Sequence, residues 1–317
     1  MILQKWKTCG IAVQGKDHID AGVVCQDNVA ALCANGVHAI ALSDGGGSRK
    51  FSQIGSEYST KAAVQLLVER FDDFYVRMER IAQGGRNAQS LLLALRLEIL
   101  DAVLNALREQ VSAERALLDF GCTLQFAAVK DGRYIAGHVG DGVMAALYQR
   151  GLARRVEVLS HPENGEGPNV TFFVTDHNAK DHLRLLHGEC HQLEGILMMS
   201  DGPEELLYSA ANGMHQNTQK LFDNFAGVGE MQYRDNLERF LSRTVARHSF
   251  DDLSLNLLYL ENADSTAISA EYRPELFAGI EGAGQVKRVS AYAYMLDPSL
   301  PAGEAMDLSF LTSEVSQ

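Results

Sequence analysis

The chain has 317 residues, of which 46% are hydrophobic and 22% charged, a composition that excludes a disordered, collagen-like or low-complexity protein. Its 28 basic and 41 acidic residues give a formal net charge of -13 at pH 7, which argues against nucleic acid and membrane surfaces as partners. The five cysteines are scattered without a Cys-x-x-Cys pair, and no apolar run reaches the ~18 residues needed to span a bilayer. We therefore expect a cytoplasmic protein.

The first third of the chain predicts a strand meander followed by two helices. Four short apolar stretches are separated by Gly, Asp and Asn, and they lie at residues 11–13, 23–25, 29–32 and 37–42. After the glycine triplet at 45–47 the pattern changes to helical spacing, first over residues 54–71 and then over 87–111. Two helices forming an antiparallel layer are expected there.

The middle and end of the chain return to strands, with one helical interruption. Three apolar runs at 123–129, 134–139 and 143–148 are joined by turns containing Asp131-Gly132 and Asp141-Gly142, which predicts hairpins. Residues 160–194 carry turn formers and histidines without a clear period, which predicts a variable excursion. The remaining expected elements are a strand at 195–200, a short helix at 204–211, a helix at about 231–247 and a strand at 253–260. This order predicts an α+β fold with segregated layers.

Four aspartates each lie at the end of a predicted strand, next to a turn: Asp27, Asp44, Asp201 and Asp251. Several carboxylates at one sheet edge would repel each other unless a divalent cation compensates them, and oxygen ligands favour Mg²⁺ or Mn²⁺. Taken singly, however, each aspartate is better explained as a turn residue, because Asp-Gly is a common turn dipeptide.

In order and context, the motifs around these aspartates resemble those of the metal-dependent serine/threonine phosphatases of type 2C. The matching pieces are Gly15-Lys16-Asp17-His18 with Cys25-Gln26-Asp27, Ser43-Asp44-Gly45-Gly46-Gly47-Ser48, Gly121-Cys122-Thr123, Val139-Gly140-Asp141, Asn164-Gly165-Glu166, Ser200-Asp201-Gly202 and Asp251-Asp252-Leu253-Ser254. The resemblance covers roughly residues 10–260 and implies two central antiparallel β-sheets flanked by helix pairs. We expect a catalytic domain at 1–262 and an extension of unknown role at 263–317.

The resemblance also implies roles for individual residues. Asp44 would bridge two Mn²⁺ or Mg²⁺ ions, and the Gly45 carbonyl would bind the second ion. Asp201 and Asp251 would hold the first ion, while Asp27 would orient metal-bound water. Asp44 and Asp27 are therefore the expected catalytic residues.

The choice between Asp251 and its neighbour Asp252 is one of strand register. A slip of one residue moves a side chain to the other face of a strand, so the two carboxylates cannot both be ligands by the same geometry. We expect Asp251 to be the ligand, because the ligand in the family precedes a polar residue and then an apolar one.

Two positions depart from the family pattern. Gly22 stands where many members carry a phosphate-binding arginine, and Gly46 stands where eukaryotic members carry a histidine that protonates the leaving group. His18 and Arg49 are candidates to bind the phosphate instead, although a solvated surface position is the simpler explanation of each.

The expected function is hydrolysis of phosphoserine or phosphothreonine in proteins, opposing a cognate kinase. Two cations ~3.5–4 Å apart would neutralise the phosphoryl oxygens and activate the bridging water that attacks phosphorus. A catalytically silent module that binds phosphopeptides or regulates a partner is the first alternative. A phosphatase of small metabolites is the second.

Overall fold

The computed structural model describes residues 5–150, 153–165 and 170–261. The expected extension at 263–317 lies outside them. Among the helices of the described segments, none has both the length and the apolar character that crossing a bilayer requires.

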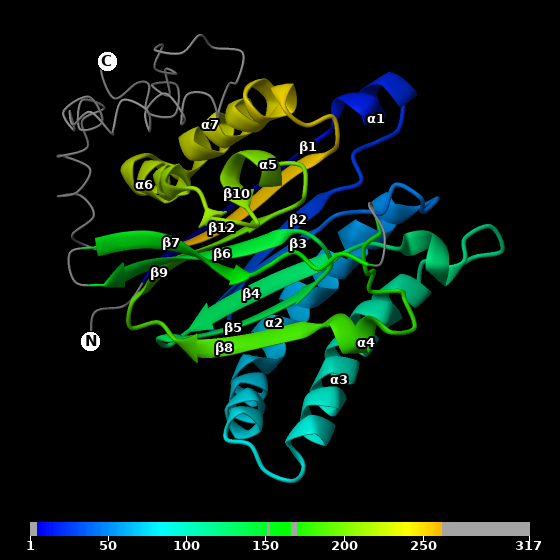
Figure 1. The fold of residues 1–317 in the computed structure, drawn as a ribbon. Coiled ribbons are helices and arrows are strands. Elements are labelled where there is room, and N and C mark those ends of the chain that lie inside the picture. The colour runs from blue at the N-terminus through cyan, green and yellow to red at the C-terminus, as the bar shows by residue number, and fades with distance from the viewer. Residues whose placement is uncertain (1–4, 151–152, 166–169, 262–317) are drawn as a thin grey trace.

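Two five-stranded antiparallel sheets form the centre of the molecule (Figure 1). The first has the order β1 (Lys5–Val13), β12 (Leu253–Glu261), β9 (Leu193–Met199), β6 (Val143–Arg150) and β7 (Ala153–Ser160). The second has the order β2 (Asn28–Ala34), β3 (Val37–Ser43), β4 (Leu124–Lys130), β5 (Arg133–Val139) and β8 (Arg184–Glu189). The α+β architecture expected from the sequence is confirmed.

Side chains alternate between the two faces of each sheet, as the pleat requires. On β3, Ile40 and Leu42 point into a core between the sheets, where they meet Ile196 and Met198 of β9. Ala39 and Ala41 of β3 point outward, into the core beneath the helices. The central strands β3, β4, β9 and β12 are buried on both faces, so their sequences read as nearly continuous apolar runs.

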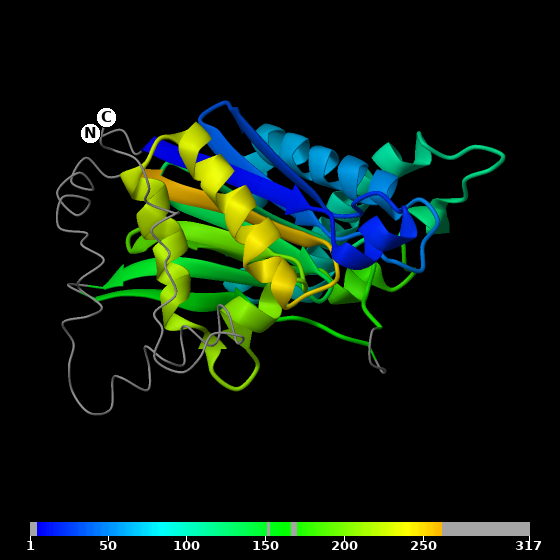
Figure 2. The ribbon, with the colours of Figure 1, turned by 90° about the horizontal axis from the view of Figure 1, so that it is seen from above.

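Helices cover the outer face of each sheet. The second sheet carries α2 (Ser52–Ala82) and α3 (Ala88–Arg108), and the first carries α6 (Gln219–Gly227) and α7 (Glu230–Arg243), as Figures 1 and 2 show from two sides. Buried residues recur along α2 at helical spacing, from Ala63 through Phe71 to Met78, and form its apolar face.

The remaining elements are short connections. They are α1 (Lys16–Ala21), η1 (Leu117–Phe120), α4 (Ala179–His182), α5 (Glu204–Leu207), β10 (Tyr208–Ser209), β11 (Gly213–Met214), η2 (Gln216–Thr218) and η3 (Val245–Arg247).

One of the two expected hairpins is wrong. The Asp131-Gly132 turn closes the hairpin of β4 and β5, with φ angles of 47° and 74° that suit a type I′ turn. The turn at Asp141, in contrast, joins strands of different sheets, because β5 pairs with β4 and β8 while β6 pairs with β7 and β9. Gly140 makes this corner with φ 112°, which a residue with a side chain rarely adopts.

Residues 160–194 are more regular than a variable excursion. They contain α4 and β8, and β8 pairs with β5 to form the edge of the second sheet. The strand expected at residues 23–25 is absent. These residues lie in the irregular link between α1, which ends at Ala21, and β2, which starts at Asn28. The sequence also missed β7 and α6.

Candidate active site

Asp44 follows the last residue of β3 and is fixed through its backbone. Its N–H donates to the Thr123 hydroxyl (3.0 Å), and its carbonyl accepts from the Thr123 N–H (2.8 Å). The next residue, Gly45, lies opposite Cys122 in an antiparallel bridge, but the two residues do not hydrogen-bond to each other. In such a non-hydrogen-bonded pair the backbone carbonyl points away from the partner segment, so the Gly45 carbonyl is directed away from Cys122. A Cβ atom at Gly45 would lie 2.7 Å from the Gln26 carbonyl oxygen, so the close approach requires glycine.

Asp27 immediately precedes β2 and lies in the interior, with only 6% of its surface exposed. Neither of its carboxylate oxygens has a hydrogen-bond partner. Burial, reinforced by the charges of Asp252 and Asp201, raises the pKa of Asp27 to about 8. The hydroxyls of Ser254 and Ser200 lie near enough to offset part of that rise.

Asp201 and Asp251 come from the first sheet, at the end of β9 and before β12. Burial raises the pKa of Asp201 to about 7, and the charges of Asp251 and Asp141 add to the effect. Burial also raises the pKa of Asp44 well above its usual range, with further contributions from the charges of Asp27, Asp201, Asp141 and Asp251. Because such charge effects act at short range, the five carboxylates occupy one region.

The structure thus brings together the four aspartates that the sequence singled out, and it adds Asp141. Burial raises the pKa of Asp141, and the charge of Asp251 raises it further. The sequence assigned Asp141 to a hairpin turn. The pattern shared with Asp44 and Asp201, a buried strand followed directly by an aspartate and a glycine, could have identified it.

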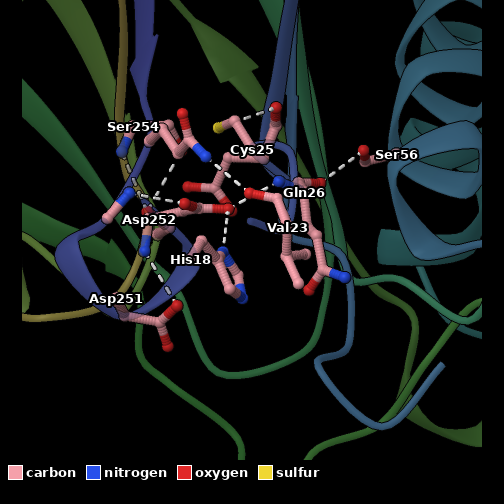
Figure 3. Close-up of polar contacts among 12 residues, drawn as sticks. His18, Val23, Cys25, Gln26, Ser56, Asp251, Asp252 and Ser254 are labelled. Atoms are coloured by element: carbon pink, nitrogen blue, oxygen red, sulfur yellow. Dashed lines mark hydrogen bonds and ion pairs between the residues drawn. The ribbon is translucent and has the colours of Figure 1, made fainter. Parts of the chain in front are cut away.

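The adjacent residues Asp251 and Asp252 serve different purposes (Figure 3). Asp251 is exposed and contributes to the charge around Asp44 and Asp201. Asp252 is only 2% exposed, and its carboxylate accepts hydrogen bonds from the backbone N–H groups of Gly15 (2.7 Å) and Gln26 (2.5 Å). The carboxylate of Asp252 is thus occupied by backbone groups, and the choice of Asp251 as the metal ligand stays a prediction.

The structure places the two candidate phosphate-binding residues in different settings. His18 Nδ1 lies 2.9 Å from Asp252 Oδ2, so this nitrogen faces a structural carboxylate. The guanidinium of Arg49 lies 5.2 Å from the centre of the Phe173 ring and 3.6 Å from Asp176 Oδ1. Arg49 Nε is buried without a hydrogen-bond partner.

Both departures from the family pattern have a local structural reason. Gly22 ends α1 in the left-handed conformation, with φ 67°, which favours glycine. A Cβ atom at Gly46 would lie 2.4 Å from Phe173 Cζ. The Phe173 ring therefore occupies the space that a histidine at position 46 would need.

The donor set suits hard divalent cations. It consists of oxygen atoms, and both Asp27 oxygens and Asp141 Oδ1 are buried without hydrogen-bond partners. Positive charge at this place would relieve the mutual repulsion that raises the pKa values of Asp44 and Asp201. Over residues 5–150, 153–165 and 170–261, no three His, Cys, Asp or Glu side chains surround one point closely enough to hold a metal ion. Two observations therefore support a cation at this place: the donors are oxygen atoms, and the neighbouring carboxylates repel one another.

Several solved structures with a similar fold are described as phosphatases. A bacterial serine phosphatase is 15% identical over 82% of this chain and 99% of its own, with a TM-score of 0.54. Stp1, a serine/threonine phosphatase from Staphylococcus aureus, is 15% identical over 81% and 96%, with a TM-score of 0.52. The serine-threonine phosphatase 2C from Toxoplasma gondii is 13% identical over 80% and 95%, also with a TM-score of 0.52.

These identities are low enough that the similarities show the fold alone. No curated protein sequence matches the chain significantly. The family model described as protein phosphatase 2C matches residues 14–242, which is well over half of the chain. This protein therefore belongs to the protein phosphatase 2C family.

Proposed function

We propose that this protein is a metal-dependent phosphatase that hydrolyses phosphoserine or phosphothreonine monoesters in proteins. The observation that carries the proposal is the group of partly or fully buried carboxylates, Asp27, Asp44, Asp141 and Asp201, whose pKa values are all raised in one region. Perturbed acids gathered at the end of two sheets are typical of a catalytic site. Membership of the protein phosphatase 2C family supports the same conclusion.

The residues that would hold two Mn²⁺ or Mg²⁺ ions are Asp44, Asp201, Asp251 and the carbonyl of Gly45. When bound, two such cations supply positive charge for the phosphoryl oxygens and lower the pKa of a water molecule, so that it attacks phosphorus near neutral pH. Without that charge, the carboxylates gathered here would repel a phosphate dianion.

Other residues would bind and orient the reactants. Asp27 would accept a hydrogen bond from the attacking water and align it with phosphorus. Arg49 would donate to the phosphate, since its Nε lacks a partner and it lies beyond the same turn as Asp44. Attack forms one P–O bond and breaks the ester P–O bond, and the serine or threonine alkoxide takes a proton from solvent because Gly46 offers no acid.

Hydrolysis of para-nitrophenyl phosphate, with Mn²⁺ or with EDTA, tests the proposal. We expect Asp44→Asn and Asp201→Asn to lower kcat/KM by at least ~100-fold, since a loss of a few kcal/mol of charge stabilisation costs that much. Asp131→Asn is the matched control: this aspartate also precedes a glycine after a buried strand, but it lies in a hairpin turn.

Turnover that persists in EDTA, or equal rates in all three variants, would contradict the mechanism. Absence of turnover on this substrate and on a panel of phosphopeptides, with Mn²⁺ bound, would favour the silent phosphopeptide-binding module. Turnover of small phosphate esters but of no phosphopeptide would favour the metabolite phosphatase.

A further inference from the structure

The buried carboxylate of Asp252 joins parts of the chain that are far apart in sequence. It accepts from the N–H of Gly15, 237 residues away, and from the N–H of Gln26, 226 residues away. His18 Nδ1 lies 2.9 Å from the oxygen that Gln26 also contacts. Figure 3 shows Asp252 at the centre of these contacts, between the N-terminal segment and the start of β12.

The Gln26 contact bears directly on Asp27. The N–H of Gln26 is held by Asp252, and its carbonyl accepts the Ser56 hydroxyl of α2 at 2.6 Å. The backbone of Gly45 also packs closely against Gln26. Three separate elements therefore fix the residue that immediately precedes Asp27.

Two glycines bring further segments against the Asp251–Asp252 pair. A Cβ atom at Gly15 would lie 2.2 Å from the backbone carbon of Asp251, and one at Gly202 would lie 2.2 Å from the carbonyl oxygen of Asp252. Gly202 directly follows Asp201. The strand start that carries Asp251 is thus enclosed between the N-terminal loop and the turn that carries Asp201.

We infer that Asp252 is a positioning residue, whose carboxylate sets the places of Asp27 and Asp251 relative to each other. This inference rests on the proposed function above. A carboxylate suits the role because both backbone partners, Gly15 and Gln26, are N–H donors and its two oxygens only accept. An asparagine would keep one acceptor and turn its NH₂ group toward a backbone N–H, leaving a buried donor unpaired.

The test compares Asp252→Asn with Glu194→Gln in the full chain. Glu194 is a matched control, since it is also buried (8% exposed) and paired, with Arg154 at 2.7 Å, but it lies on β9 away from the Asp27 segment. Mn²⁺ binding is measured by isothermal titration calorimetry, kcat and KM with para-nitrophenyl phosphate, and backbone protection by hydrogen exchange.

For Asp252→Asn we expect ~10–100-fold weaker Mn²⁺ binding, as for other residues that orient ligands. We also expect a fall in kcat that exceeds the change in KM, and faster exchange over residues 15–28. Glu194→Gln should lower the melting temperature without any of these changes. Wild-type affinity and wild-type exchange in Asp252→Asn would overturn the inference.

If Asp252→Asn does not fold, Ser56→Ala and Ser59→Ala decide. Both remove a buried hydroxyl from α2, but Ser56 contacts Gln26 whereas Ser59 contacts Cys122. Only Ser56→Ala should lower kcat, and equal effects would refute the positioning role. A wild-type protein that neither binds Mn²⁺ nor hydrolyses phosphate would refute the proposed function, while hydrogen exchange would still test whether Asp252 holds residues 15–28.

Discussion

Asp27 combines burial with weak hydrogen bonding of its carboxylate, which only the nearby hydroxyls of Ser254 and Ser200 relieve in part. An isolated buried charge is costly, which is why the pKa of this group rises to about 8 and the carboxyl retains its proton near neutral pH in the absence of cations. The metal-free protein therefore gives up stability to keep an acid at this place.

That cost predicts a pH-dependent gain from Asp27→Asn. The folded pKa is raised above the unfolded value, so the folded state holds the extra proton, and stability is lost as pH rises from about 4 through about 8 at about 1 kcal/mol per unit. In EDTA, the variant should therefore gain more over wild type at pH 8.5 than at pH 5.5. Urea unfolding at the two pH values measures the gain, and an equal gain at both would contradict the raised pKa.

The sequence located Asp44, Asp201 and Asp251 because each follows or precedes a recognisable buried strand. It failed for Asp141 because the local pattern is the same as at Asp131, which is an ordinary hairpin residue. The two aspartates differ only in the pairing of the strand that follows: β5, after Asp131, pairs back with β4, whereas β6, after Asp141, joins the other sheet. Long-range contacts decide this pairing. Nor could the sequence show that Asp252 holds the N-terminal segment.

At the scale of elements, α2 links the Asp44 turn to the helical layer. The sequence predicted this helix over 54–71, and it extends to Ala82 because Phe74, Tyr75 and Met78 continue its buried stripe. Polar residues on the exposed face of α2 make the hydrophobic periodicity weaker beyond residue 71, so the sequence did not predict the C-terminal part of the helix. One helical glycine, Gly55, faces the backbone of Phe120.

Gly55→Ala should destabilise the protein although alanine favours helices. A Cβ atom there would lie 2.1 Å from the Phe120 carbonyl oxygen, so α2 must shift away from η1, at a cost of about 1–3 kcal/mol. Gln65→Ala, on the exposed side of the same helix, should stay within about 0.5 kcal/mol of wild type. Chemical denaturation measures both, and a stabilised Gly55→Ala would show that the contact relaxes without cost.

At the scale of the whole molecule, the acids come from both sheets. Asp27 and Asp44 belong to the second sheet, Asp201 and Asp251 to the first, and Asp141 lies on the connection between them. The apolar pattern predicted strands, and the family resemblance implied that they form two sheets. Neither could give the neighbours of β8 or β12, which depend on pairings between distant parts of the chain.

Mn²⁺ should therefore stabilise the folded protein as a whole. A cation that binds only the folded state adds about 2.7 kcal/mol at a concentration 100 times its Kd. We expect the melting temperature to rise with Mn²⁺ concentration and to return with EDTA. Asp44→Asn should abolish the rise and Asp131→Asn should keep it, whereas a rise of equal size in both variants would place the bound ion elsewhere.

The corner at Gly140, where the chain passes from one sheet to the other, makes the candidate active site depend on the assembly of both sheets. A piece of the chain that formed either sheet by itself would carry only two or three of the five acids and could not gather the others. Catalytic competence should consequently emerge late in folding, after the sandwich has closed. Small slips between the facing layers, even from substitutions deep in the middle of the molecule such as at Ile40 or Ile196, would then alter the spacing on which the proposed hydrolysis relies.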